Sequence, residues 1–221
     1  MTLWYFTRAT GGVALVLLTL SLVLGVLDVT RISSPRVPRF VVDGLHRSVS
    51  LLVVVFVGIH VLTAVLDSYA PIRLVDAVIP FGGSYRPLWV GLGAVAFDLL
   101  LALVVTSLLR ARVGVRAWRA LHWLAYACWP FALLHGLGTG SDVKPGWLLW
   151  LSIGCIVAVA IAVIGRAAAA YSAAPAVSGV LAALAIAVTA LAIWLPTGPL
   201  ASGWAKKSGT PSSLIKGGRS Q

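Results

Sequence analysis

The sequence predicts an all-α membrane protein, a single six-transmembrane-helix bundle. Sixty per cent of its 221 residues are hydrophobic and only 10% are charged. The mean hydropathy is +1.00, a value that ordinary soluble domains do not approach. Six apolar runs are long enough to cross a hydrocarbon core of about 30 Å as helices, which takes about 20 residues each. The runs lie near residues 9–29, 44–67, 88–109, 118–138, 146–166 and 177–196.

The runs are expected to be helices because lipid offers the backbone no hydrogen-bond partners, and they lack the alternation of barrel strands. The first run is not expected to be a signal peptide, since no small-residue cleavage site follows it. Residues 1–196 therefore form one transmembrane domain in this interpretation. Residues 197–221, rich in Gly, Ser, Lys and Pro, have little to bury and are predicted to be a basic, flexible, extracytoplasmic tail.

The basic residues indicate an orientation in the membrane. The formal net charge is +11, but most of the basic residues lie beside the runs, so topology explains them better than a nucleic-acid partner does. Nine of them flank the first, third and fifth connections, against four near the runs on the other side when the tail is left out. The positive-inside tendency then predicts that both termini lie outside. We expect an integral protein of a bacterial-type plasma membrane.

All four histidines lie in the second and fourth runs: His46, His60, His122 and His135. Ionisable side chains inside a membrane are costly, so such a cluster predicts a functional site. His46 and His60 are 14 residues apart, a rise of about 21 Å that ends about 40° short of whole turns, so they share a helix face. His122 and His135 are 13 apart, which leaves them about 140° out of line in an ideal helix. Pro130 lies between them, and we expect it to kink the helix and change that angle.

The two helices therefore offer one imidazole each at two matching heights. A histidine pair without Cys or carboxylate ligands suits a bis-imidazole haem better than zinc, which takes three or four protein ligands. The predicted pairs are His46 with His122 and His60 with His135, in an apolar slot between helices. The alternative, in which each histidine only bonds a neighbouring helix, stays open. Cys128 and Cys155 lie inside predicted helices and are interpreted as small core residues.

Two segments carry a family resemblance: HRSVSLLVVVFVGIH (46–60) and TSLLRARVGVRAWRALHWLAY (106–126), followed by His135. They resemble the ferric reductase-like transmembrane domain that is shared with NADPH oxidases, over roughly residues 9–166. The resemblance implies that His46 and His122 bind the iron of an inner haem b, and His60 and His135 that of an outer one. It also implies electron transfer from the cytoplasmic side to an outside acceptor such as ferric iron or oxygen.

The chain departs from the reductases after the fifth run. There it has RAAAAYSAAPAVSG (166–179) and a sixth run instead of a flavin and nicotinamide domain, and no G-x-G-x-x-G follows a predicted strand. We therefore expect an oxidoreductase-type electron-transfer subunit with a separate donor, either a flavoprotein or a membrane quinol. The layout is also similar to the haem subunit of the bacterial periplasmic methionine sulfoxide reductase system. That likeness implies an extracytoplasmic partner protein, which the tail could dock.

Arginines are the expected partners of haem propionates. Arg47 and Arg119 are predicted at the inner level because they neighbour the ligands in sequence. Further candidates are Arg116 at the inner level, and Arg73 and Arg86 at the outer level. Topology alone also explains each of them.

Asp98, in the middle of the third run, has two open interpretations. It either relays protons or bonds a histidine N–H, or it is a protonated carboxyl that bonds a neighbouring helix. The chain has no glutamate and no credible Ser-His-Asp set, so hydrolytic catalysis is not expected and no catalytic residue is assigned. Two rival classes remain. One is a haem-free anchoring subunit, and the other is a transporter, which should have inverted repeats and broken helices.

Overall fold

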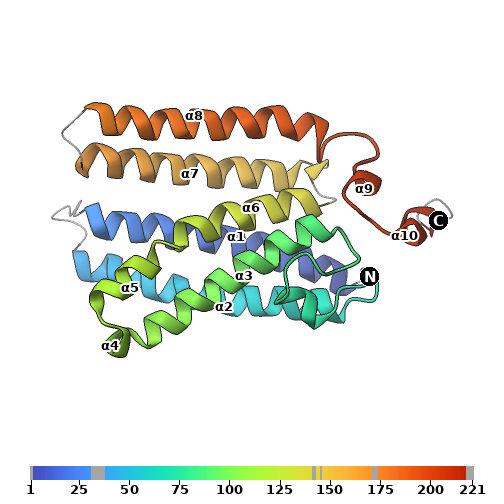
Figure 1. Ribbon diagram of the computed structural model, residues 1–221, viewed down its shortest axis with the longest axis horizontal. Helices are drawn as coiled ribbons and strands as arrows, with labels where there is room; N and C mark the ends of the chain where they lie inside the picture. The colour runs from blue at the N-terminus through green and yellow to red at the C-terminus, as the bar shows by residue number, and fades with distance from the viewer. Residues whose placement is uncertain (1, 31–37, 141–142, 145, 171–173, 218–221) are drawn as a thin grey trace.

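The computed structural model describes residues 2–30, 38–140, 143–144, 146–170 and 174–217, and these residues form helices and loops without a strand. The helices run antiparallel along one long axis (Figure 1). They are α1 (Thr2–Thr30), α2 (Arg39–Leu66), the short 3-10 helix η1 (Leu74–Ala77), α3 (Pro87–Leu108), α4 (Arg110–Val113), α5 (Val115–His122), α6 (Ala125–Thr139), α7 (Trp147–Ala170), α8 (Ala174–Thr197), α9 (Trp204–Lys207) and α10 (Ser212–Gly217).

Five of these helices, α1, α2, α3, α7 and α8, are long and apolar enough to cross a membrane. They correspond to five of the six predicted runs, so the chain is an integral membrane protein of the all-α class. The fourth run, 118–138, is not one helix as predicted. It is divided between α5 and α6, which are separated at Trp123 and Leu124.

The division has a local backbone cause. The N–H groups of Trp123, Leu124, Tyr126 and Ala127 each bond the carbonyl three residues earlier. Trp123 has φ/ψ of −61°/−20° and Leu124 has −61°/−19°, which are 3-10 values. Pro130, the residue expected to disturb this helix, lies inside α6 beyond the interruption. The proline therefore does not mark the place where the helix is broken.

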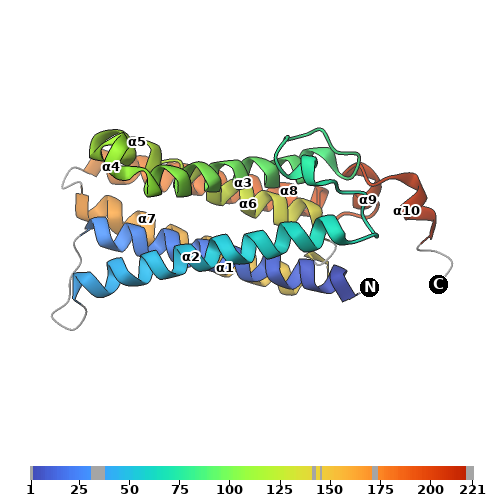
Figure 2. The ribbon, with the colours of Figure 1, turned by 90° about the horizontal axis from the view of Figure 1, so that it is seen from below.

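Helix α1 is central in the bundle, where it packs against α2, α6 and α7, while α3 packs on α6. Buried side chains of α1, α6 and α7 form the main core, among them Leu15, Leu133 and Cys155. The Trp129 Nε1–H donates a 2.9 Å hydrogen bond to Thr19 Oγ1 inside it. Both cysteines are free and buried, as the sequence predicts. Figures 1 and 2 place α8 on the outside against α7, and none of its side chains from Ser178 on is buried, which suits a lipid-facing helix.

The bundle has two distinct ends. Helix α1 begins and α10 ends at one of them, which we call the terminal end (Figure 1). Helices α4 and α5, with the first turns of α2, lie at the other. We call this the arginine end because it carries Arg39, Arg47, Arg110 and Arg119.

Residues 198–215, which the sequence predicts to be part of a flexible tail, include α9 and the start of α10 and contact the end of the bundle. Arg86, only 5% exposed, holds the segment in place. Its side chain donates to the Gly138 and Thr139 carbonyls at 3.2 and 2.9 Å and to Thr210 Oγ1 at 2.9 Å. A cation is favourable there because the last carbonyls of α6 lack partners within the helix. One buried arginine thus joins the start of α3, the end of α6 and the C-terminal segment.

Candidate functional site

The four histidines lie in two pairs at different heights in the bundle. His46 of α2 faces His122 at the end of α5, with ring centroids 6.3 Å apart and ring planes at 77°. His60 of α2 faces His135 of α6, with centroids 6.1 Å apart and planes at 81°. The arginine-end pair and the terminal-end pair therefore have almost the same geometry. They are also the pairs formed by matching heights in the sequence.

The centroid separations suit one metal ion between two imidazoles. A metal–nitrogen bond to histidine is about 2.0 Å long, and a five-membered ring with bonds of about 1.33 Å has a radius of about 1.1 Å. Two bonds and two radii together span about 6.2 Å. No group of three or more His, Cys, Asp or Glu side chains is gathered among the described residues. The donor set is thus a histidine pair at each level, which fits a haem iron rather than zinc.

Three of the four rings are held by backbone carbonyls. The Nδ1 atoms of His46, His60 and His135 lie 2.9, 2.8 and 2.9 Å from the carbonyl oxygens of Ser21, Thr7 and Trp89. A carbonyl only accepts, so each Nδ1 carries the proton and each Nε2 keeps its lone pair for a metal. Such second hydrogen bonds orient metal-binding histidines. Asp98 is not the acceptor in any of these three bonds.

Glycines lie against the same three rings, and the sequence analysis missed them. A Cβ atom built on Gly11 would lie 2.9 Å from His60 Cε1, and one on Gly25 would lie 3.2 Å from His46 Cε1. A Cβ on Gly93 would lie 2.5 Å from His135 Nδ1. The signal for two of them was available, because Gly11 and Gly25 are 14 residues apart, like His46 and His60.

His122 is held differently. Its Nδ1 is buried without a hydrogen-bond partner among the described residues. The ring lies on Trp118, with centroids 4.9 Å apart and planes at 31°. The Trp118 Nε1–H donates to Ser107 Oγ at 3.3 Å, and Arg110 lies 4.3 Å from a Trp118 ring centroid.

The 3-10 turn explains how His122 and His135 come into line. Thirteen α-helical steps rotate the chain by about 1300°, whereas fourteen steps from His46 to His60 rotate it by about 1400°. The bonds at Trp123–Ala127 place about five of the thirteen steps in 3-10 form, at about 120° each, which brings their total to about 1400° as well. The longer 3-10 rise of about 2.0 Å per residue also brings the axial distance to about 22 Å, close to the 21 Å of α2.

A mostly apolar cavity surrounds the terminal-end pair. Its lining includes His60 and His135 and comes from α1, α2, α3, α6, α7 and the loop after α2. Arg8 is the arginine that lines it, rather than Arg73 or Arg86. Arg47, Arg116 and Arg119 are exposed at the arginine end. Their predicted contacts with propionates stay predictions.

Arg73 forms a loop ion pair with Asp76, Nη2 to Oδ1 at 2.9 Å. The Arg73 backbone N–H also donates to Asp76 Oδ2 at 2.9 Å. The guanidinium beside Asp76 holds the pKa of that carboxyl below its ordinary value. Asp76 also lines the terminal-end cavity. The pair therefore fixes a loop that covers the cavity.

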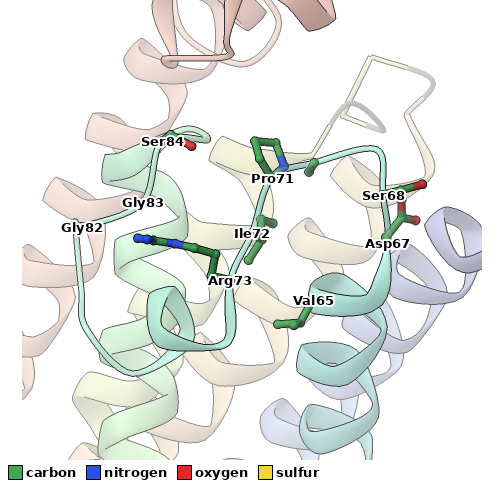
Figure 3. Close-up of a pocket in the computed structure, with 10 residues that line it drawn as sticks. Val65, Asp67, Ser68, Pro71, Ile72, Arg73, Gly82, Gly83 and Ser84 are labelled. Carbon is green, nitrogen blue, oxygen red and sulfur yellow. The ribbon is translucent and has the colours of Figure 1, made fainter.

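A second, more open cleft lies at the terminal end between residues 65–73 and 82–84 (Figure 3). In Figure 3 the Arg73 side chain extends toward Gly82 and Gly83. Val65 and Ile72 line both this cleft and the cavity around His60 and His135. The cleft is therefore adjacent to the terminal-end histidine pair.

Comparison with known proteins places the helices that carry the histidines in one family. The family profile described as "Ferric reductase like transmembrane component" matches residues 10–133, more than half of the chain. This match includes His46, His60 and His122 and ends two residues before His135. Searches of curated proteins and of solved structures found no match.

Proposed function

Because the chain belongs to the ferric reductase-like transmembrane family, we propose that it is a di-haem cytochrome b that transfers electrons across the membrane. The donor is a cytoplasmic flavoprotein or a quinol, and the acceptor is extracytoplasmic. His46 and His122 hold one haem b at the arginine end, and His60 and His135 hold a second at the terminal end. The bound haems supply the one-electron redox chemistry.

The observation that carries this proposal is the repeated histidine geometry. Two pairs have centroid separations of 6.3 and 6.1 Å, and in three of the four rings a carbonyl fixes the proton on Nδ1. A histidine that only joined two helices would need no second imidazole with its ring centroid 6.1 or 6.3 Å away. The rival interpretation as a haem-free anchoring subunit therefore leaves this arrangement unexplained.

The protein residues provide ligation, spacing and a dry environment. The two levels are about 21 Å apart along α2, which is most of a hydrocarbon core of about 30 Å. Apolar side chains around His60 and His135 exclude water from the ligand bonds. We propose that α5 and α6 together form the sixth crossing, which agrees with both ends of the chain lying at the terminal end. The excess of basic residues at the arginine end supports a cytoplasmic location for that end.

The acceptor is proposed to bind at the terminal end, next to the His60–His135 pair. The cleft that shares Val65 and Ile72 with that pair's cavity offers a small acceptor, such as a ferric chelate or oxygen, a close approach. A partner reductase of the methionine sulfoxide type is the second candidate, because the folded segment 198–215 presents a surface at the same end. Arg8 is the cation proposed to meet a propionate there, with Arg47 and Arg119 at the other level.

The proposal is tested on protein purified after expression with ample haem. We expect b-type bands in the dithionite-reduced spectrum and two haems per chain in a pyridine haemochrome assay. Replacing both His46 and His122 with Ala should remove one haem, and replacing all four histidines should remove both. The matched control is Gly58→Ala in α2, whose added Cβ would meet nothing within 4 Å. Absence of b-type bands in the unaltered protein would refute the cytochrome function and favour the anchoring subunit.

A further inference from the structure

The same small backbone unit recurs at three of the four histidines. In each case the Nδ1–H donates to a helix carbonyl, and the residue four positions after that carbonyl is a glycine lying against the ring. The units are Thr7 and Gly11 for His60, Ser21 and Gly25 for His46, and Trp89 and Gly93 for His135. Two units lie on α1, which contributes no histidine, and one lies on α3.

Helix geometry explains why the glycine stands four residues after the carbonyl. In an α-helix the Cα–Cβ bond leans toward the N-terminus, so a side chain covers the turn before its own position. The residue at i+4 therefore shields the carbonyl at i, whose second lone pair remains available for another donor. A glycine at i+4 leaves that lone pair open to an imidazole. Any other residue would place a Cβ atom 2.5 to 3.2 Å from the ring at the three positions.

We propose that Gly11, Gly25 and Gly93 are positioning residues of the haem sites. Each one exposes the carbonyl that orients a histidine and keeps its Nδ1 protonated, so that Nε2 faces the partner ring. The proposal rests on the proposed haem-binding function and assigns these roles to residues that bear no ligand atoms. It makes α1 part of both sites.

The fourth histidine provides an internal contrast. Fourteen residues after Trp89 and Gly93, α3 has Leu103 and Ser107 in the corresponding places. The Leu103 carbonyl accepts the Thr106 hydroxyl at 3.2 Å, and the His122 Nδ1 has no partner among the described residues. We therefore expect Trp118 and the end of α5 to orient His122. A ligand at this position should not need an N–H group to bind.

Alanine substitutions test the glycines directly. Gly25→Ala should lower haem occupancy or shift the midpoint potential and the low-spin electron paramagnetic resonance signal at the arginine-end level alone. Gly11→Ala and Gly93→Ala should do the same at the terminal-end level alone. The controls are Gly58→Ala in α2 and Gly154→Ala in α7, whose added Cβ atoms would meet nothing within 4 Å and which do not line the cavity around His60 and His135. Both controls should keep two haems with unchanged potentials.

A chemical complementation experiment keeps the proposal testable even where a glycine variant fails to fold. Each histidine is replaced singly by Gly, and free imidazole or 1-methylimidazole is added as the missing ligand. Only imidazole has an N–H for the carbonyl, so it should bind more tightly than 1-methylimidazole by about 2-fold to 10-fold at positions 46, 60 and 135. At position 122 the two ligands should bind equally.

The outcomes separate this inference from the proposed function. Unaltered protein without haem refutes the function itself. Unaltered protein with two haems, but with glycine variants whose spectra and potentials match the controls, refutes only the role of the glycines. Equal binding of both ligands at all four positions, or the same preference at all four, also overturns it.

Discussion

An alanine inserted between Trp123 and Leu124 should leave both haem sites intact, although it lengthens the spacing of His122 and His135 to 14. The reason is the 3-10 turn between them, which winds thirteen steps through about 1400°. Fourteen regular α-helical steps give the same rotation and a rise of about 21 Å, as from His46 to His60. The inserted residue can be absorbed if the 3-10 turn relaxes into α-helix.

Two matched changes should each cost a haem, although the insertion between Trp123 and Leu124 should not. Deleting Leu124 removes a step from a turn that is already tightly wound, so His122 rotates by about 100°. An alanine inserted between Val54 and Val55 rotates one end of α2 by the same amount. With the ring about 5 Å from the helix axis, such a rotation carries the imidazole about 8 Å, too far for ligation. We expect two haems per chain for the first insertion and at most one for each of the other changes.

The assay is a haemochrome count and a reduced spectrum on each purified variant, with helical content checked by circular dichroism. Loss of a haem in the insertion variant, in which His122 and His135 are 14 positions apart, together with retention in the Leu124 deletion, would falsify the winding argument. Pro130 gives a further check. Pro130→Ala should keep both haems, because the proline lies inside α6 and not at the interruption.

Three further predictions concern the terminal end. His60→Ala should remove one haem and leave the spectrum of the arginine-end haem unchanged, as a redox titration with one remaining component would establish. Arg86→Gln should lower stability by about 3 kcal/mol, because it breaks charged hydrogen bonds to buried carbonyls. This corresponds to a fall in melting temperature of roughly 6–12 °C, with faster trypsin cleavage at Lys206. The control Arg73→Gln changes a side chain that is 70% exposed and leaves Asp76 its backbone N–H donor, so it should cost less than about 1 kcal/mol. An equal effect of both substitutions would contradict this role of Arg86. The lowered pKa of Asp76 should stabilise the fold above the ordinary Asp value of about 3.9, and this contribution disappears as the pH falls below it. The melting temperatures of the unaltered protein and Asp76→Asn should therefore converge progressively as the pH falls below about 3.9, and a constant difference would exclude the linkage.

Hydropathy and histidine spacing predict most of the architecture. The apolar runs locate five of the long helices, because the length of a membrane crossing is set by the hydrocarbon core and not by tertiary contacts. The equal heights of the histidines predict which rings meet. The family resemblance in the two histidine-bearing segments agrees with the profile match over residues 10–133.

The break at Trp123 and Leu124 was not predictable from composition, because it contains neither glycine nor proline. It became visible only in the backbone hydrogen bonds. The C-terminal segment has mostly polar and small residues, and its contacts with the bundle are long-range bonds, such as Arg86 to Thr210, 124 positions away, and Trp204 to the Gly138 carbonyl.

The acceptors of the histidine N–H groups were also missed. Every residue has a backbone carbonyl, so the sequence does not mark which carbonyl accepts a histidine N–H. The only sign of these acceptors in the sequence is a glycine four residues later. Asp98 was a candidate because a carboxyl group inside a membrane is rare. The acceptors of the three ring N–H groups are instead the backbone carbonyls of Thr7, Ser21 and Trp89.

The transmembrane helices differ in whether an unrelated apolar helix could replace them, because α1 provides the carbonyls that bond His46 and His60. A leucine-rich anchor that kept Trp194, which contacts the Trp89 and Trp204 rings, could take the place of α8, because no α8 side chain from Ser178 on is buried. The same anchor could not take the place of α1, because it would cover the Thr7 and Ser21 carbonyls with side chains. A minimal electron-transfer unit cut from this chain must therefore include its ligand-free first helix.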